Sequence, residues 1–244
     1  MIVFGWLSGC NFRLAGKDWG VVFLLSLLRA VTSFSLIIAY QNIASGVAST
    51  IHFMYPLAVA LAMMFFFREK KSLLVILAVL MSLLGAALLS LGELEAKSGN
   101  TMVGLVAACV SVFSYAGYIV GVRTTRAVQI NSTALTCYVM GLGTIFYLIG
   151  AYCTSGLQLV SDGYTWLIIL GLALPATAIS NITLVQAIKY AGPTLTSILG
   201  AMEPLTAVVI GVFVFKELFT VNSAVGIILI LLAVSIVVFR RQKS

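Results

Sequence analysis

Glu203 is the residue with the clearest potential for chemistry, because it lies midway along an apolar segment and directly before Pro204. If that segment crosses a membrane, a charge there costs roughly 2.5–3.5 kcal/mol on insertion scales, so such residues usually face a cavity or a partner. Desolvation favours a neutral carboxyl group, which suits a proton carrier or a counter-ion for a cationic substrate. The alternative is a protonated carboxyl group that is hydrogen-bonded between helices.

Arg29 and His52 are the next candidates. Arg29 lies midway along another apolar segment and could neutralise a substrate carboxylate or pair with Glu203. It could equally extend to the membrane interface or fill a gap in a helix bundle. His52 is the single histidine, and its side chain titrates near physiological pH, which suits a proton-coupled step. Its alternative role is a hydrogen bond to a neighbouring helix.

Two helical faces carry further polar side chains. Ser111, Tyr115 and Tyr118 share one face, and Thr177 and Asn181 share another. Such faces point inward in lipid, and we expect the tyrosines and Asn181 to line a cavity, while Ser and Thr bond between helices.

Enzymatic chemistry is not expected. The sequence has no phosphate loop, metal-ligand cluster or nucleophile–base pair, and Asp18 and Asp162 fall in loops on opposite sides. We therefore expect no metal and no cofactor.

The composition defines the environment in which these residues act. Of 244 residues, 61% are hydrophobic and 9% are charged, against about 25% charged in soluble domains, and the mean hydropathy is +1.15. Most of the surface must therefore face lipid. The net charge of +7 is scattered in short clusters, which excludes nucleic acid as a partner and leaves a small solute and membrane lipid.

The apolar runs predict an all-α, polytopic membrane helix bundle. They are continuously apolar, whereas the strands of a β-barrel alternate, and a membrane-spanning helix needs roughly 20 such residues. The predicted spans are 19–40, 45–67, 73–91, 102–122, 133–154, 164–188, 194–215 and 221–239. Of the 14 Lys and Arg residues, eleven fall in loops on one side and only Lys97 and Lys216 on the other. Both termini are therefore predicted to be cytoplasmic.

An internal repeat relates two of these spans. Aligning Pro56 with Pro204 superimposes STIHFMYPLAVALAMMFFFREK on SILGAMEPLTAVVIGVFVFKEL, including the basic–acidic pair that ends each segment. The copies lie five spans apart and therefore cross in opposite directions, as in the inverted repeats of secondary transporters. Tyr55 is the counterpart of Glu203, and Gly200 is the counterpart of His52. The paired prolines can kink their helices, as hinges beside a site or through packing alone.

The segment 187–238, with MEPLTAVVIGVFVFKE and then GIILILLAVSIVV, resembles the second half of EamA-type proteins of the drug/metabolite transporter superfamily. The segment 40–91 resembles the same unit in their first half. The resemblance implies ten helices in two inverted five-helix repeats. On that pattern, residues 1–98 form a first repeat that lacks its first two helices, and residues 99–244 form a complete second repeat.

The resemblance implies a secondary transporter that exports a small metabolite or drug-like solute by alternating access. We expect it in the inner membrane of a bacterium, with Glu203 or His52 as the candidate for proton coupling. The alternative is a non-transporting fragment or a partner subunit of a membrane complex. The sequence specifies neither the substrate nor the oligomeric state.

Overall fold

The computed structural model describes residues 12, 14–69, 73–90, 99–154, 162–200, 202–214 and 221–242. Its regular structure is helical, and no strand occurs among these residues, which confirms the all-α prediction. The longer elements are α2 (Trp19–Asn42), α3 (Ser45–His52), α4 (Tyr55–Phe66), α5 (Leu73–Ser90), α6 (Thr101–Thr124), α7 (Ser132–Thr154), α8 (Gly163–Gly171), the π-helical η4 (Leu172–Ile179), α9 (Ser180–Ala191), α10 (Pro193–Leu199), α11 (Met202–Val214) and α12 (Val221–Gln242). The 3-10 turn η1 (Gly16–Asp18) directly precedes α2, and the 3-10 turn η3 (Arg126–Gln129) lies between α6 and α7.

Several helices are long and apolar enough to cross a membrane. Within the described residues these are Gly16–Asn42, Thr101–Thr124, Ser132–Gly150 and Val47–Phe66, the last of which is interrupted by a turn at residues 53 and 54. Leu73–Gly85 and Ala224–Ile236 are shorter apolar helices. All eight predicted spans fall on helical segments, but the number of membrane crossings stays a prediction. Phe215 and the Lys216–Glu217 pair of the repeat lie outside the described residues.

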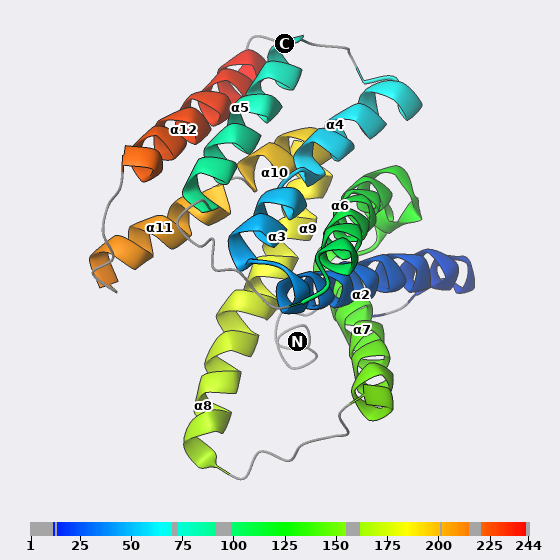
Figure 1. Cartoon of the computed structure of the whole chain (residues 1–244). Coiled ribbons are helices and arrows are strands. Elements are labelled where there is room, and N and C mark those ends of the chain that lie inside the picture. The colour runs from blue at the N-terminus through cyan, green and yellow to red at the C-terminus, as the bar shows by residue number, and fades with distance from the viewer. Residues whose placement is uncertain are drawn as a thin grey trace. The chain divides into compact units, whose positions relative to one another are not determined.

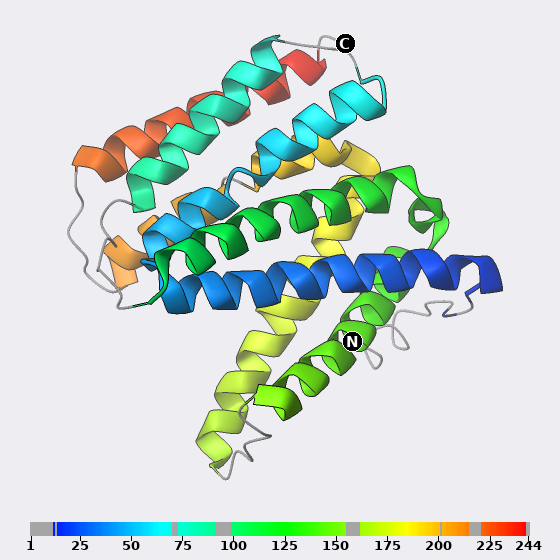
Figure 2. The same cartoon turned by 45° about the vertical axis from the view of Figure 1, so that its right-hand side comes forward.

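Two predicted spans are broken helices rather than continuous ones. The chain leaves α3 at His52 and enters α4 at Tyr55, a break that is visible in Figure 2. In the same way, α10 ends at Leu199 and α11 begins at Met202. Proline has no N–H group to donate, so it fits the first turn of a new helix better than the interior of a continuous one. Pro56 and Pro204 therefore follow helix breaks, and the breaks lie at equivalent positions of the repeat.

A third predicted span, 164–188, is interrupted by the π-helical segment η4, which separates α8 from α9. This segment contains Pro175, whose missing N–H group disturbs the ordinary helical ladder. Single π-helical turns often occur at functional sites. The interruption was not predicted, although Pro175 was a visible signal for it.

The chain divides into two compact units, which we describe separately. The first unit comprises residues 1–30 and 121–192, and the second comprises residues 31–120 and 193–244. Helices α2 and α6 therefore contribute residues to both units. Each unit also takes segments from both predicted sequence repeats, whose boundary at residues 98 and 99 stays a prediction.

The core of the second unit lies around α5 and α12, which run side by side (Figure 1). Gly85 of α5 contacts α12 so closely that an added Cβ would lie 2.7 Å from the carbonyl oxygen of Gly226. One buried apolar cluster joins α4, α5, α10 and α12, and another joins the end of α2 to α3 and α6. These contacts fix α3, α4 and α10, which carry the helix breaks.

Candidate functional site

Four of the predicted site residues form one aromatic cluster in the second unit. The ring centroid of Tyr115 lies 5.4 Å from that of His52 and 4.7 Å from that of Tyr55. His52 and Tyr55 are themselves 5.5 Å apart, and Tyr118 stacks on Tyr115 at 6.3 Å. The Tyr118 side chain is fully buried and Tyr55 is 4% exposed, whereas His52 and Tyr115 are half-buried. The α3–α4 break thus brings two of its side chains against the polar face of α6.

Hydrogen bonds define the tautomer of His52. Ser111 Oγ donates its single proton to the carbonyl oxygen of Ala108 at 2.6 Å. The same Oγ lies 2.9 Å from His52 Nδ1, so it must accept a proton from that nitrogen. Neutral His52 therefore carries its proton on Nδ1. His52 thus makes the hydrogen bond to a neighbouring helix that was its alternative role.

The second helix break contacts the first one at Tyr55. A Cβ built on Gly200 would lie 1.9 Å from the Tyr55 hydroxyl oxygen, so only glycine allows this approach. Three residues further on, the N–H group of Glu203 donates to the carbonyl oxygen of Gly200 at 3.0 Å. Glu203 is exposed in the first turn of α11, where the helix dipole favours negative charge.

Arg29 and Asn181 form a separate polar contact in the first unit. Arg29 Nη2 donates to Asn181 Oδ1 at 3.1 Å. Asn181 is 5% exposed, and its Nδ2 donates to the carbonyl oxygen of Thr177 in η4 at 2.7 Å. The predicted polar face of Thr177 and Asn181 therefore lies against the charged residue of α2.

A basic group in the first unit lies on the side that the charge distribution predicts to be cytoplasmic. Lys189 directly follows the predicted span and donates from Nζ to the carbonyl oxygen of Ile130. Arg123 donates in turn to the carbonyl oxygen of Lys189. Burial lowers the pKa of Lys189 to about 8.

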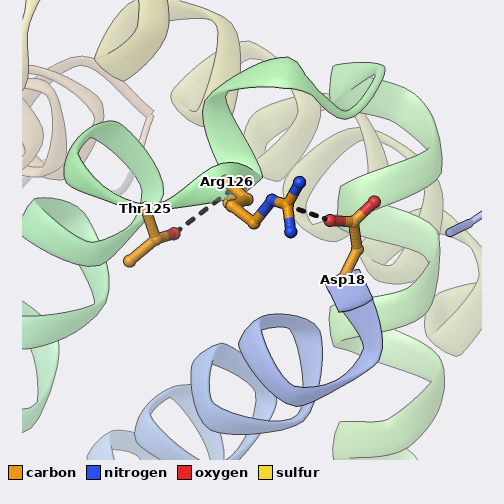
Figure 3. A network of polar contacts seen from close by, with 4 residues as sticks. Asp18, Thr125 and Arg126 are labelled. Atoms are coloured by element: carbon orange, nitrogen blue, oxygen red, sulfur yellow. Dashed lines mark hydrogen bonds and ion pairs between the residues drawn. The ribbon is translucent and has the colours of Figure 1, made fainter. Parts of the chain in front are cut away.

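Asp18 and Arg126 form an ion pair at 3.7 Å close to Thr125, which caps η3 (Figure 3).

The sequence did not single out a contact between Glu69 and Thr194 in the second unit. Thr194 Oγ1 donates to Glu69 Oε2 at 2.6 Å, which joins the segment that follows α4 to the start of α10. Glu69 was noticed only as part of the repeated basic–acidic pair. Thr194 is the second residue of α10, directly after Pro193, and nothing in its local sequence signalled a contact with Glu69.

Apolar helices of membrane-spanning length and paired helix breaks are features of integral, multi-pass membrane transporters. The sequence profile of the EamA-like transporter family matches residues 102–239, which is more than half of the chain. The chain therefore belongs to the EamA-like transporter family and is a membrane transporter. The family resemblance predicted from the sequence is confirmed.

One curated relative supports this assignment, and one solved structure shares the fold. A curated protein of Archaeoglobus fulgidus, named as an uncharacterized transporter, is 28% identical over 238 residues, covering 96% of this chain and 83% of its own. A solved crystal structure with 18% identity superposes with a TM-score of 0.82, covering 100% of this chain and 84% of that chain. At this identity, the solved structure shows the fold alone.

Proposed function

We propose that this chain is a secondary active transporter that exports a small metabolite or drug-like solute by alternating access. It lies in the cytoplasmic membrane of a bacterium, with both termini in the cytoplasm. The observation that carries the proposal is the contact of Tyr55 with Gly200, where two helix breaks at equivalent positions of the repeat meet. Secondary transporters bind their substrates beside such discontinuous helices.

The chemistry around this contact suits a solute site. The cluster of His52, Tyr55, Tyr115 and Tyr118 offers aromatic faces, hydroxyl groups and an imidazole within a few ångströms of one another. A helix break also gives each half-helix freedom to tilt at its end, because no continuous hydrogen-bond ladder passes through it. The same place can therefore bind a solute and undergo the movement that alternating access requires.

Glu203 is the proton-coupling group in this proposal. Its carboxylate is exposed in the first turn of α11, three residues after Gly200. Protonation changes the charge of Glu203 beside the helix break. Proton binding can therefore shift the balance between the two arrangements of α10 and α11 that alternating access requires, one open to each side of the membrane. His52, the single histidine, is the second candidate for proton coupling and lies within the same unit.

The test is transport by the full chain in proteoliposomes with an imposed pH gradient and an internal pH-sensitive dye. Solute-dependent proton movement should occur with the natural chain and be lost with Glu203→Gln. Asp162→Asn is the matched control, because it also converts a carboxylate to an amide but caps α8 outside the predicted spans. Undiminished, pH-dependent transport by Glu203→Gln would exclude this carboxylate as the coupling group.

A further inference from the structure

The half-helices α4 and α10 pack against each other in the second unit, on the side that the charge distribution predicts to be cytoplasmic. At one end of the pair, Tyr55 at the start of α4 meets Gly200 just after α10. At the other end, Thr194 Oγ1 donates to Glu69 Oε2 at 2.6 Å. The two helices therefore run in opposite directions, and the pair is held together at both ends.

The interface between these two ends is apolar and buried. Ala60 and Met64 of α4 and Ile198 of α10 belong to one buried cluster, and Leu57 and Leu195 pack against it. The space between α4 and α10 is thus filled by side chains along its length. A solute can pass between the two helices only after they separate.

The pairing is one-sided with respect to the internal repeat. Aligning Pro56 with Pro204 makes α11 the equivalent of α4 and α3 the equivalent of α10. Within the described residues α3 and α11 show no comparable packing on each other, since α11 lies against α5 and α12, and α3 lies against α5. Gly46 stands at the position equivalent to Thr194 and has no hydroxyl group to donate. Such asymmetry between equivalent halves is expected of a transporter held in one of its two arrangements.

A sharp backbone turn after α4 places Glu69 at this interface. Arg68 has a φ of 55°, a left-handed conformation that favours glycine and is uncommon for residues with a side chain. The N–H group of Glu69 donates to the carbonyl oxygen of Met63 at 3.0 Å. Backbone strain of this kind persists where the surrounding contacts fix it, and it clusters at clamps and switch regions. Here it brings the carboxylate of Glu69 to Thr194, which is 6% exposed.

The bond between Glu69 and Thr194 combines strength with the ability to break. A separation of 2.6 Å is typical of a hydroxyl group that donates to a carboxylate, and such bonds are stronger than those between neutral groups. Glu69 is exposed, so water can solvate its carboxylate once the bond is broken. A fully buried carboxylate would instead be left without a partner at a high cost. The bond can therefore open and re-form as α4 and α10 move.

We propose that Glu69 and Thr194 form a latch that holds the ends of α4 and α10 together and that must open before the solute site faces the cytoplasm. Each half-helix then tilts at its helix break and parts from the other at the latch. This inference rests on the proposed transport function. It goes beyond that function by naming the contact that sets the balance between the two arrangements.

The test measures how accessible a single cysteine at position 115 is from each side of the membrane. Tyr115→Cys is made in the full chain with its four native cysteines replaced, and a membrane-impermeant thiol reagent is added to right-side-out or inside-out vesicles. Thr194→Val removes the hydroxyl donor and should raise the ratio of cytoplasmic to external labelling roughly 10- to 100-fold, the range expected for hydrogen bonds to charged groups. Glu69→Gln should shift the ratio in the same direction by a smaller factor, because an amide oxygen still accepts. The double variant should shift the ratio no further than Thr194→Val alone.

Thr165→Val is the matched control, because Thr165 Oγ1 also donates to a carboxylate, that of Asp162, at 3.0 Å in the first unit. It should leave the labelling ratio unchanged. Thr194→Ser keeps the hydroxyl group and should behave like the natural chain. This pair of variants separates loss of the bond from other effects of substitution at position 194.

A cross-link tests the latch if Thr194→Val does not fold. Glu69→Cys and Thr194→Cys, combined in the chain without native cysteines, would be joined by a short, cleavable, bifunctional thiol reagent. Transport in proteoliposomes should stop when the two positions are linked and should return when the link is cleaved. Undiminished transport by the fully linked chain would overturn the latch.

An unchanged labelling ratio in Thr194→Val would also overturn the latch, as would an equal change in Thr165→Val or no cytoplasmic labelling of any variant. A bond with a structural role alone would lower the unfolding temperature of Thr194→Val and leave the ratio as it was. These outcomes are distinguishable from failure of the proposed function. A natural chain that moves no solute contradicts transport, whereas the labelling ratio is measured without solute and reports on the latch.

Discussion

The hydroxyl group of Tyr55 packs directly against Gly200, where a Cβ atom would lie 1.9 Å from the hydroxyl oxygen. Tyr55 is the first residue of α4, and Gly200 lies between α10 and α11. Two broken helices of the second unit therefore touch at their breaks. Tyr55 is buried between His52 and Tyr115, so its ring has little room to move away from Gly200.

Gly200→Ala should destabilise the protein and impair transport, because the new methyl group overlaps the Tyr55 hydroxyl. Overpacking of this kind costs about 1–3 kcal/mol. Tyr55→Phe removes the overlapping oxygen, and the nearest ring atom, Cζ, would then lie 3.2 Å from the new Cβ. The double variant should therefore recover part of the lost stability, as measured by unfolding in detergent.

The double variant should not recover all of the lost stability, because the carbonyl oxygen of Ser197 lies 3.0 Å from the Cβ position at residue 200. Additive effects of Gly200→Ala and Tyr55→Phe would contradict the contact, because residues in direct contact show a coupling energy in a double-mutant cycle.

His52 should carry its neutral proton on Nδ1. Because His52 is the single histidine, ¹⁵N-histidine labelling of a chain without a histidine tag gives one imidazole, whose two nitrogen shifts report the tautomer. Ser111→Ala removes the acceptor of the Nδ1 proton and should cost about 0.5–1.5 kcal/mol of stability. A neutral ring protonated on Nε2 would contradict the hydrogen-bond assignment.

Gly85→Ala should destabilise the second unit, because the added Cβ would lie 2.7 Å from both the carbonyl oxygen of Gly226 and the side chain of Ile230. Backbone cannot move away as a flexible side chain can, so we expect a loss of about 1–3 kcal/mol. Gly141→Ala is the control, since nothing lies within 4 Å of its Cβ position. The control should be neutral or stabilising by up to about 1 kcal/mol through helix propensity. Equal effects of the two variants would argue against tight packing of α5 on α12.

Lys189 should make stability rise with pH above about 8. Burial lowers its pKa from 10.5 to about 8, so between these values the unfolded chain binds more protons than the folded one. The cost of charging the buried amine is therefore fully present below pH 8 and is relieved as the pH rises towards 10.5. The unfolding temperature of the natural chain should rise over this range relative to Lys189→Met.

Lys17→Met is the control for loss of a lysine charge, because Lys17 is exposed at the start of the first unit. If the unfolding temperature of the natural chain and that of Lys189→Met depended on pH in the same way, the pKa of Lys189 would not be lowered by burial.

Much of the fold follows from the sequence because lipid imposes long, continuously apolar helices. The predicted spans 19–40 and 102–122 match α2 and α6 to within two residues at each end. The helical period also places Ser111, Tyr115 and Tyr118 on one face, and all three lie at the cluster around His52. These features depend on local hydropathy and helical geometry alone.

The helix breaks and the Arg29 contact depend on tertiary packing, which local patterns do not contain. A proline removes one hydrogen bond, but whether the helix bends or stops depends on its neighbours, here the contact of Tyr55 with Gly200. Arg29 was expected either to meet a charged partner or substrate, or to extend to the membrane interface or fill a gap in the bundle. Its contact with Asn181 joins residues 152 positions apart, which no local pattern predicts.

The most direct test of alternating access at the two helix breaks is the accessibility of a single cysteine at position 115. Tyr115→Cys, in a chain whose four native cysteines are replaced, would be treated with a membrane-impermeant thiol reagent in right-side-out and inside-out vesicles. We predict labelling from both sides, with the balance between the sides shifted by pH and by Glu203→Gln. Labelling from one side only under every condition, or no labelling from either side, would contradict a solute site that opens alternately at these breaks.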